Sequence, residues 1–217
     1  GLDFTYFDRE DSNLPVSITA AGGTGYTGLS VNSKITSTAG VEAMISGTPI
    51  LTDDIRWDVS FNFGRFKKTV DFIYEGIERN ILDSWLSWSS MDLQEIVGQE
   101  WGMLYGRKRL KDDAGNWVLF NSGNHRYTNN TLLGNIMPDF TGGITSTLQY
   151  KNWDFAVGID FQEGGLYHSV TDMFSMAAGL HEYTAGLNDK GNPKRDAVSA
   201  GGGIHQVGVK LDGSVHD

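Results

Sequence analysis

The histidines of this 217-residue chain are the first side chains to consider for metal binding or acid–base chemistry. None belongs to an HxxxH or His/carboxylate ligand motif, so the pattern favours solvated loop histidines and predicts no metal site. The chain has no cysteine, which excludes a thiolate metal site and a disulfide framework. The five histidines are His125, His168, His181, His205 and His216.

Two pairs of carboxylates, Glu95 with Glu100 and Asp160 with Glu163, could be the acid and base of a glycosidase. The sequence gives no reason to bring either pair to the required separation, and solvated charge is the default. The run 112–116 (DDAGN) is rich in oxygen ligands but lacks the remaining EF-hand positions, so it favours a plain turn. The sequence therefore predicts no catalytic residue, no cofactor and no enzyme activity.

Four tryptophans stand in segments that we expect to be loops or rims: Trp85, Trp88, Trp101 and Trp117. An exposed indole could stack on a sugar ring, because it offers a flat apolar face at small entropic cost. Trp85, Trp88 and Trp101 are the candidate substrate-binding residues. Core packing or contact with a partner subunit is the alternative for each tryptophan.

The composition excludes two classes of protein. The formal net charge of −10 argues against a nucleic-acid groove, which needs clustered Lys and Arg. No run of about eighteen apolar residues occurs, so a helical membrane span is excluded. The 28 glycines and 12% aromatic residues suit a protein made of strands and turns.

Two segments alternate almost completely between apolar and polar residues, as strands with two different faces do. One reads IRWDVSFNF (55–63) and the other begins at Trp153 and runs to Phe161. Each is about nine residues long, the length that a tilted strand needs to cross a bilayer. The apolar face of each strand could meet either a protein core or lipid.

The rest of the chain contains further strands, loops and one helix. Gly1 and Asp217 do not coincide with natural ends of a fold, so we expect a fragment or sub-region of a longer protein. The expected elements are a strand at 1–8, a loop at 12–30, a weaker strand at 31–46 that ends by Pro49, a helical or irregular excursion at 66–96, strands at 101–109 and 116–120, a loop at 121–130, a hairpin within 134–162 that turns at Lys151-Asn152, a helix at 169–182, and loop beyond.

A series of motifs in a fixed order resembles the barrel of SusC/RagA-type TonB-dependent outer-membrane transporters. The motifs are GTPI (47–50), WxVxFNF (57–63), YEG (74–76), VGQEWGMLYGRKRLKDDAGN (97–116), LGNIMPDFTGG (133–143) and YKNWDF (150–155). The resemblance implies a barrel of 22 antiparallel strands with an N-terminal plug, located in the outer membrane of Gram-negative cells. It also implies nutrient uptake of glycans or peptides, energised through the TonB complex, with a SusD-like surface lipoprotein as partner.

Under this resemblance the fold class is all-β, and 1–217 is a partial antiparallel transmembrane β-barrel with long extracellular loops, without plug or final strands. Trp57 and Trp153 would lie near the inner interface, with Phe66 and Phe161 near the far one. The residues expected to face the lumen are Arg56, Asp58, Asn62, Asp154 and Asp160. The residues expected to face lipid are Trp57, Val59, Phe61, Phe155, Val157 and Ile159.

Two other classes of protein remain open at this stage. A soluble, secreted β-sandwich that binds carbohydrate through exposed tryptophans would show the same alternation. A fragment of an acidic glycoside hydrolase has the least support, because neither carboxylate pair has a reason to be close. Detergent dependence would separate the transporter from the sandwich.

Overall fold

The computed structural model describes residues 1–19, 23, 25–83 and 90–216, and these form an all-β, antiparallel structure. The chain divides into two compact units. Unit 1 comprises Gly1–Tyr105 and Leu132–Leu166, and unit 2 comprises Gly106–Thr131 and Tyr167–Asp217. Each unit is described by itself below.

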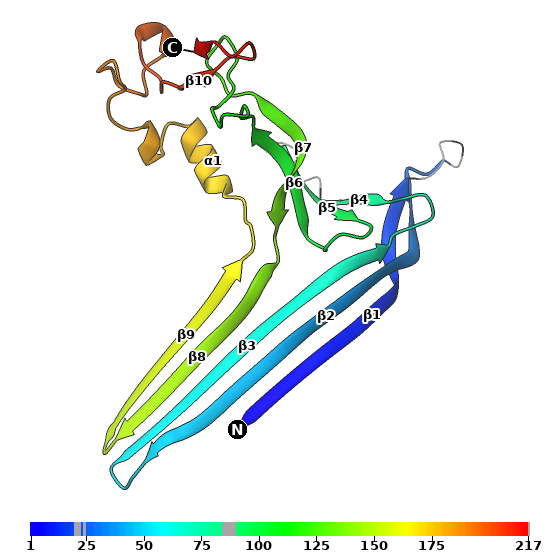
Figure 1. Ribbon diagram of the computed structural model, residues 1–217, viewed down its shortest axis with the longest axis vertical. Helices are drawn as coiled ribbons and strands as arrows, with labels where there is room; N and C mark the ends of the chain where they lie inside the picture. Colours follow the sequence, from blue (N-terminus) through cyan, green and yellow to red (C-terminus); the bar gives the residue numbers. More distant parts are fainter. Residues whose placement is uncertain (20–22, 24, 84–89, 217) are drawn as a thin grey trace. The chain divides into compact units, whose positions relative to one another are not determined.

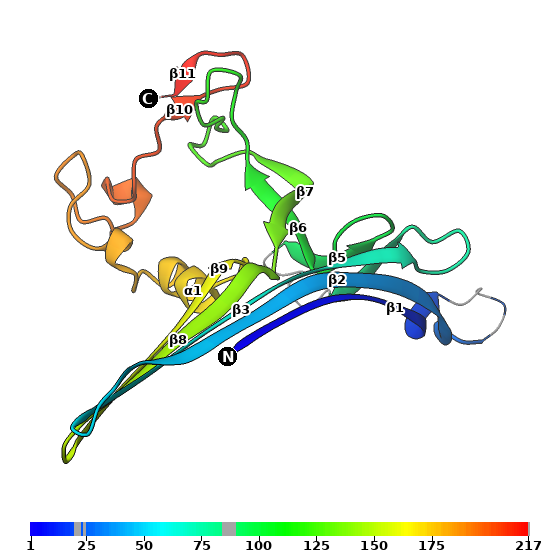
Figure 2. The ribbon, with the colours of Figure 1, turned by 60° about the horizontal axis from the view of Figure 1, so that its bottom comes forward.

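Unit 1 is built on a five-stranded sheet whose order is β1-β2-β3-β8-β9 (Figure 1). All neighbouring strands are antiparallel, and two of the hairpins turn tightly, at residues 52–54 and at Lys151-Asn152. The second view shows the strands of this sheet in one curved layer (Figure 2). The strands are β1 (Leu2–Thr19), β2 (Gly28–Leu51), β3 (Ile55–Phe72), β8 (Pro138–Tyr150) and β9 (Trp153–Gly164).

The two alternating segments are strands, as the sequence predicts. They lie at the start of β3 and along β9, and β8 runs between them. The register aligns their apolar residues across the sheet: Phe61 pairs with Ile144, and Ile144 with Ile159. The hairpin through Lys151-Asn152 is also confirmed, with Lys151 at a positive φ of 54°.

Several sequence-based boundaries are wrong. The expected loop at 12–30 contains the end of β1 and the start of β2. Pro15 is tolerated in β1 because this strand lies at the edge of the sheet, where the register shifts. Pro49 does not end β2 either, since a register shift between Gly47 and Ile50 accommodates it.

The expected helical excursion at 66–96 contains strands in its described part. Strand β3 continues to Phe72, and β4 (Arg79–Asp83) pairs with β5 (Met91–Ile96). Burial of residues on both faces of β5 removes the alternation that identifies a strand, because Gln94 and Glu95 are both buried. Conversely, the expected strand at 116–120 makes only isolated bridges.

The core of unit 1 lies where β1, β2 and β3 approach the loop that follows β5. Its centre is Val16, Val70 and Ile73. Apolar residues that pack against it are Ile18, Val31, Ile77, Val97 and Trp101. Within the described structure, no residue of 55–63 or of β9 is buried, so this core leaves the rest of the sheet uncovered.

A second sheet has four strands in the order β4-β5-β6-β7. The chain leaves unit 1 within β6 (Met103–Arg109) and returns to it within β7 (Tyr127–Asn135).

In unit 2, Ser169 caps the helix α1 (Val170–Ala177), its hydroxyl accepting a bond from the Asp172 N–H at 3.1 Å. The predicted helix is thus confirmed. Unit 2 also contains the 3₁₀ turns η2 (Glu182–Thr184) and η3 (Val198–Ala200) and the pair β10 (Gly208–Val209) and β11 (Val215–His216).

Four five-residue turns in unit 2 share one geometry. In each, the N–H of the first residue donates to the carbonyl of the fifth at 2.8–2.9 Å, and the fourth residue, a glycine, donates to the carbonyl of the first at 2.9–3.0 Å. The glycines have φ of 80–87°, a conformation that side chains disfavour. The turns are 112–116, 120–124, 188–192 and 210–214.

Candidate functional site

One face of the five-stranded sheet is apolar and open. Along β9, Phe155, Val157 and Ile159 are 54%, 56% and 55% exposed, and Leu2 at the opposite edge is 78% exposed. Exposed apolar residues thus reach from one edge of the sheet to the other, and a contiguous exposed apolar face marks an interaction or membrane surface. The residues predicted to face lipid, Trp57, Val59, Phe61, Phe155, Val157 and Ile159, all lie on this face.

The apolar face has five uncharged rows that cross the strands, from the row of Ile55 to the row of Phe63. The sixth row carries the first charge on this face, Arg65, which pairs with Val41 in β2. The next row carries Asp8 and Lys67. From Ile55 to Arg65, the first charged residue of β3 on this face, the distance along the strand is about 33 Å. A tilt of about 40° reduces it to about 25 Å, close to the height of a transmembrane β-barrel's apolar band.

Aromatic side chains mark both ends of this band. Trp153 pairs with Tyr150 at the hairpin end and stacks on Phe155, with ring centroids 6.3 Å apart. At the other end, the ring centroid of Phe140 lies 5.7 Å from that of Phe63 and 6.5 Å from that of Phe161. Aromatic girdles at two interfaces are typical of strands that span a membrane.

Phe66 is an exception to the predicted placement. It pairs with Gly40, and the unbroken register from Asn62 puts it on the polar face. A Cβ on Gly40 would lie 2.6 Å from both the Phe66 Cβ and the Phe7 ring, so these aromatic residues close over the glycine. The prediction that Phe66 belongs to the far lipid interface is therefore wrong. Side chains of β3 keep alternating between the two faces beyond Phe63, so Phe66 lies on the same face as Asn62.

The opposite face of the sheet is polar and charged. Arg56 and Asp58 form an ion pair of 2.7 Å on it, and Thr48 Oγ1 donates to the second oxygen of Asp58 at 2.6 Å. A shallow groove of about 410 Å³ passes this cluster. The residues predicted to face the lumen, Arg56, Asp58, Asn62, Asp154 and Asp160, share this face.

Two of these residues approach each other across a glycine. Asn62 in β3 and Asp160 in β9 both pair with Gly143 in the strand between them. A Cβ on Gly143 would lie 2.8 Å from the Asp160 carboxylate and 3.1 Å from the Asn62 amide. The glycine thus gives both polar side chains room over β8, and a larger residue would displace them.

Trp101 lies at the edge of the core rather than alone on a rim. Its indole N–H donates to Glu95 Oε1 at 3.0 Å. Glu95 is fully buried, and it also accepts bonds from Lys34 at 2.8 Å and from Asn80 at 3.2 Å. The expectation of solvated charge is wrong for Glu95, because three donors replace its water. Substrate binding by Trp101 stays a prediction, and Trp85 and Trp88 lie outside the described residues.

The second carboxylate of the pair, Glu100, belongs to another contact. It forms an ion pair with Lys67, and the Asn135 amide donates to it at 3.4 Å. These residues line a small cavity of about 30 Å³ with Trp101 and Pro138. The two glutamates thus have separate cationic partners, Lys34 and Lys67.

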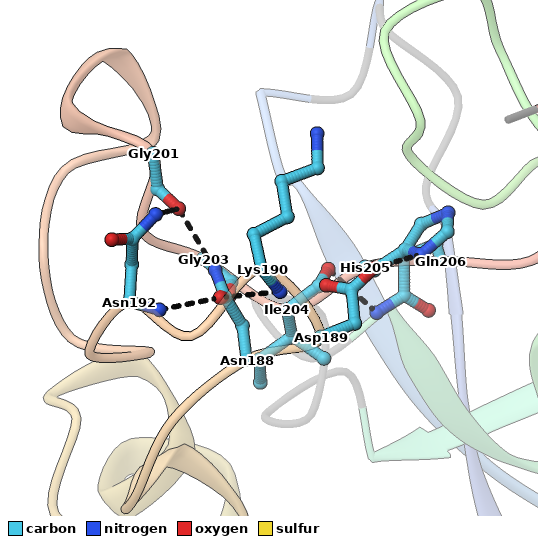
Figure 3. Close-up of polar contacts among 9 residues, drawn as sticks. All are labelled: Asn188, Asp189, Lys190, Asn192, Gly201, Gly203, Ile204, His205 and Gln206. Carbon is cyan, nitrogen blue, oxygen red and sulfur yellow. Dashed lines mark hydrogen bonds and ion pairs between the residues drawn. The ribbon is translucent and has the colours of Figure 1, made fainter.

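In unit 2, loops surround an open pocket of about 380 Å³. Figure 3 shows polar contacts among residues of the loops at 188–192 and 201–206. Asn188 Nδ2 donates to the carbonyls of Gly201 and Gly203, which tie the turn at 188–192 to the glycine-rich loop. Asp189 accepts a bond of 2.8 Å from His205 Nδ1 when the ring is protonated there. None of these contacts could be assigned from the sequence, since they join loop residues that are 13 to 16 positions apart.

The described residues contain no group of three or more His, Asp or Glu that could hold a metal ion. The run 112–116 is a turn in which the Asp112 carboxylate accepts bonds from the Asn116 N–H and side-chain amide. Its oxygens are thus used within the turn. Among the helices of the described part, none is long and apolar enough to span a membrane.

Comparison with solved structures relates part of the chain to one transport system. The RagAB peptide transporter matches 73% of this chain at 14% identity, with a TM-score of 0.56. The RagAB peptide importer matches 74% in its open-open state (13% identity, TM-score 0.57) and 74% in its closed-closed state (14%, 0.54). No protein-family model and no curated protein matches the chain.

This chain covers only 18–19% of the matched RagAB chains. At such low identity the similarity concerns the fold, and it extends over about three quarters of the present chain. About three quarters of this chain therefore has the fold of a segment of the chains solved in the RagAB structures.

Proposed function

We propose that this chain forms part of the β-barrel wall of a TonB-dependent outer-membrane transporter of the SusC/RagA type. The observation that carries the proposal is the open apolar band, five uncharged rows high and up to five strands wide, on a sheet whose other face is polar. A bilayer would cover such a band, because its height of about 25 Å matches the hydrocarbon layer that barrels cross.

The polar face would then line or brace the passage. Arg56, Asp58 and Thr48 are bonded to each other, so the charges on this face are partly compensated within the strand hairpin. A water-filled lumen tolerates such groups, whereas lipid does not. The function would be binding and translocation rather than catalysis.

The cargo and partners follow from the same proposal. The matched structures are described as a peptide transporter and importer, which supports peptides as cargo, with glycans as the other class implied by the sequence motifs. A SusD-like lipoprotein would cap the barrel, and the TonB complex would supply energy through other parts of the transporter.

A pair of adjacent substitutions tests the proposal. Val59→Arg places a charge on the apolar face near the middle of the band and should cost about 2–4 kcal/mol of stability in a membrane. Ser60→Arg places the same charge on the polar face of the same strand and should cost much less. Assembly into the outer membrane is measured by fractionation and by the heat-dependent gel mobility of folded barrels.

Equal assembly of the two variants would contradict a lipid-facing band. A protein that stays monodisperse in water without detergent would contradict it as well. That second result would support the soluble, carbohydrate-binding β-sandwich instead.

A further inference from the structure

A run of cations in unit 2 borders an open groove. Residues 107–111 read RKRLK, so four of the five are Lys or Arg in a chain with a net charge of −10. The groove has a volume of about 740 Å³. We call it the Trp117 groove, and it is lined by Arg107, Lys108, Arg109, Leu110, Lys111, Trp117, Thr128 and Thr131.

Among the described residues, the cations of this groove have no acidic partner. None of Arg107, Lys108, Arg109 and Lys111 forms an ion pair with any residue that the structure describes. The nearest acid in the sequence, Asp112, uses its carboxylate within its own turn. Like charges so close together repel one another, and an anionic ligand would relieve that repulsion.

The groove also presents a half-buried indole. Lys111 Nζ lies 4.3 Å from the centroid of the Trp117 ring, and Arg109 Cζ lies 5.9 Å from it. The Trp117 and His125 rings pack nearly at right angles, with centroids 5.6 Å apart. The ring is therefore held in place beside two of the cations, where it can pack against the apolar part of a ligand.

Two hydroxyls complete the wall of the groove. Thr131 Oγ1 donates to Thr128 Oγ1 at 2.7 Å, and Thr128 Oγ1 donates to the Lys108 carbonyl at 3.2 Å. Each hydroxyl oxygen has a second lone pair, and the Thr131 oxygen accepts no bond from a described residue. They can therefore accept hydrogen bonds from the hydroxyls of a ligand.

We infer that the Trp117 groove binds a carboxylated saccharide, that is, a glycan containing uronic acids. The guanidinium of Arg109 and its neighbours would bind the carboxylate, Trp117 would stack on a C–H face of the sugar, and the threonines would contact sugar hydroxyls. An acidic peptide would satisfy the cations but not the indole and hydroxyls together. The inference concerns unit 2 and does not depend on whether the sheet of unit 1 meets lipid.

The test is calorimetric titration of the purified whole chain with tri-galacturonate and with its neutral counterpart, galactotriose. Tri-galacturonate should bind at least about tenfold more tightly, because charge-assisted bonds are stronger than neutral ones. Raising the salt concentration from about 0.05 to about 0.5 M should weaken its binding further. This salt titration needs no variant.

Variants then locate the site. R107Q/R109Q/K111Q should weaken tri-galacturonate binding at least about tenfold. Trp117→Leu should weaken the binding of both trisaccharides. The matched control R195Q/K210Q removes two cations of unit 2 that do not line the groove and should change nothing. Equal binding of the two trisaccharides, or unaltered binding by the triple variant, would overturn the inference. Tighter binding of tri-glutamate than of tri-galacturonate would replace the saccharide by an acidic peptide.

Discussion

Lys34 Nζ lies 2.8 Å from Glu95 Oε1 and thereby joins β2 to β5 through a buried ion pair. The glutamate side chain is fully buried and the lysine side chain is 14% exposed. Trp101 donates to the same carboxylate oxygen, and Asn80 donates to the other one. The pair therefore fixes the β4–β5 hairpin and the following loop on the end of the five-stranded sheet.

Removing one partner of this pair should be costly. Lys34→Met leaves the Glu95 carboxylate buried without its cation, so we expect the free energy of unfolding to fall by about 3 kcal/mol. The measurement is urea unfolding of the protein in detergent, followed by tryptophan emission. The double variant Lys34→Met/Glu95→Met should recover part of that loss, and Lys151→Met, at an exposed turn, should lose little. An equal loss in the single and double variants would contradict the pairing.

Two strand glycines, Gly142 on the apolar face and Gly158 on the polar face, give a paired test of how much room the sheet leaves for a side chain. In Gly142→Ala the new Cβ would lie 2.5 Å from the Phe161 ring and 2.7 Å from the Asn62 carbonyl oxygen. We expect about 1–3 kcal/mol of destabilisation from this crowding. Gly158 has no heavy atom within 4 Å of the same position, so Gly158→Ala should be neutral or stabilising by about 0.5 kcal/mol. Thermal unfolding of both variants measures the difference.

The depth of Trp153 can be measured directly. Its side chain is 66% exposed at the hairpin end of the band, so in a membrane it should lie at the headgroup level. In vesicles of brominated lipid, a variant that retains only Trp153 should be quenched most by bromines near the headgroups. A variant that retains only Trp117 should be quenched little. Equal quenching of the two, or none, would contradict the orientation of the sheet.

The turn at 112–116 predicts a defined pH response. The side-chain amide of Asn116, and then its N–H, donate to Asp112 and lower the pKa of that carboxyl below its usual range. The stabilisation is therefore complete above the ordinary pKa near 4 and is lost as the pH falls through the lower folded value. Carboxyl-carbon NMR titration should show the Asp112 pKa rising toward its ordinary value in Asn116→Ala. An unchanged midpoint would contradict this assignment.

The strands with one open face were the most predictable part of the fold. Between Trp57 and Phe63 the apolar and polar residues alternate because the two faces meet different surroundings. The same pattern placed the charged and apolar residues on the correct faces from sequence alone. Where one face lacks a constant environment, as at Phe66, the alternation of residue types no longer indicates which way a side chain points.

The buried network around Glu95 could not be predicted from its sequence neighbours. Its cation comes from Lys34, 61 residues away, and no local spacing encodes that pairing. The edge position of β1, which allows Pro15 to sit within a strand, likewise depends on the strand order and not on the local residues. Long-range pairing thus decides both the polar core and the strand ends.

The recurring turn of unit 2 separates the shape of a loop from its chemistry. Two backbone bonds and one glycine set its geometry, and the second and third residues contribute no backbone bond to it. Those two positions hold Asp113 and Ala114 in one copy and Asp189 and Lys190 in another. Side chains at these two positions can therefore change while the backbone of the turn stays the same. The ligands that unit 2 binds can then change without loss of the turn's backbone hydrogen bonds.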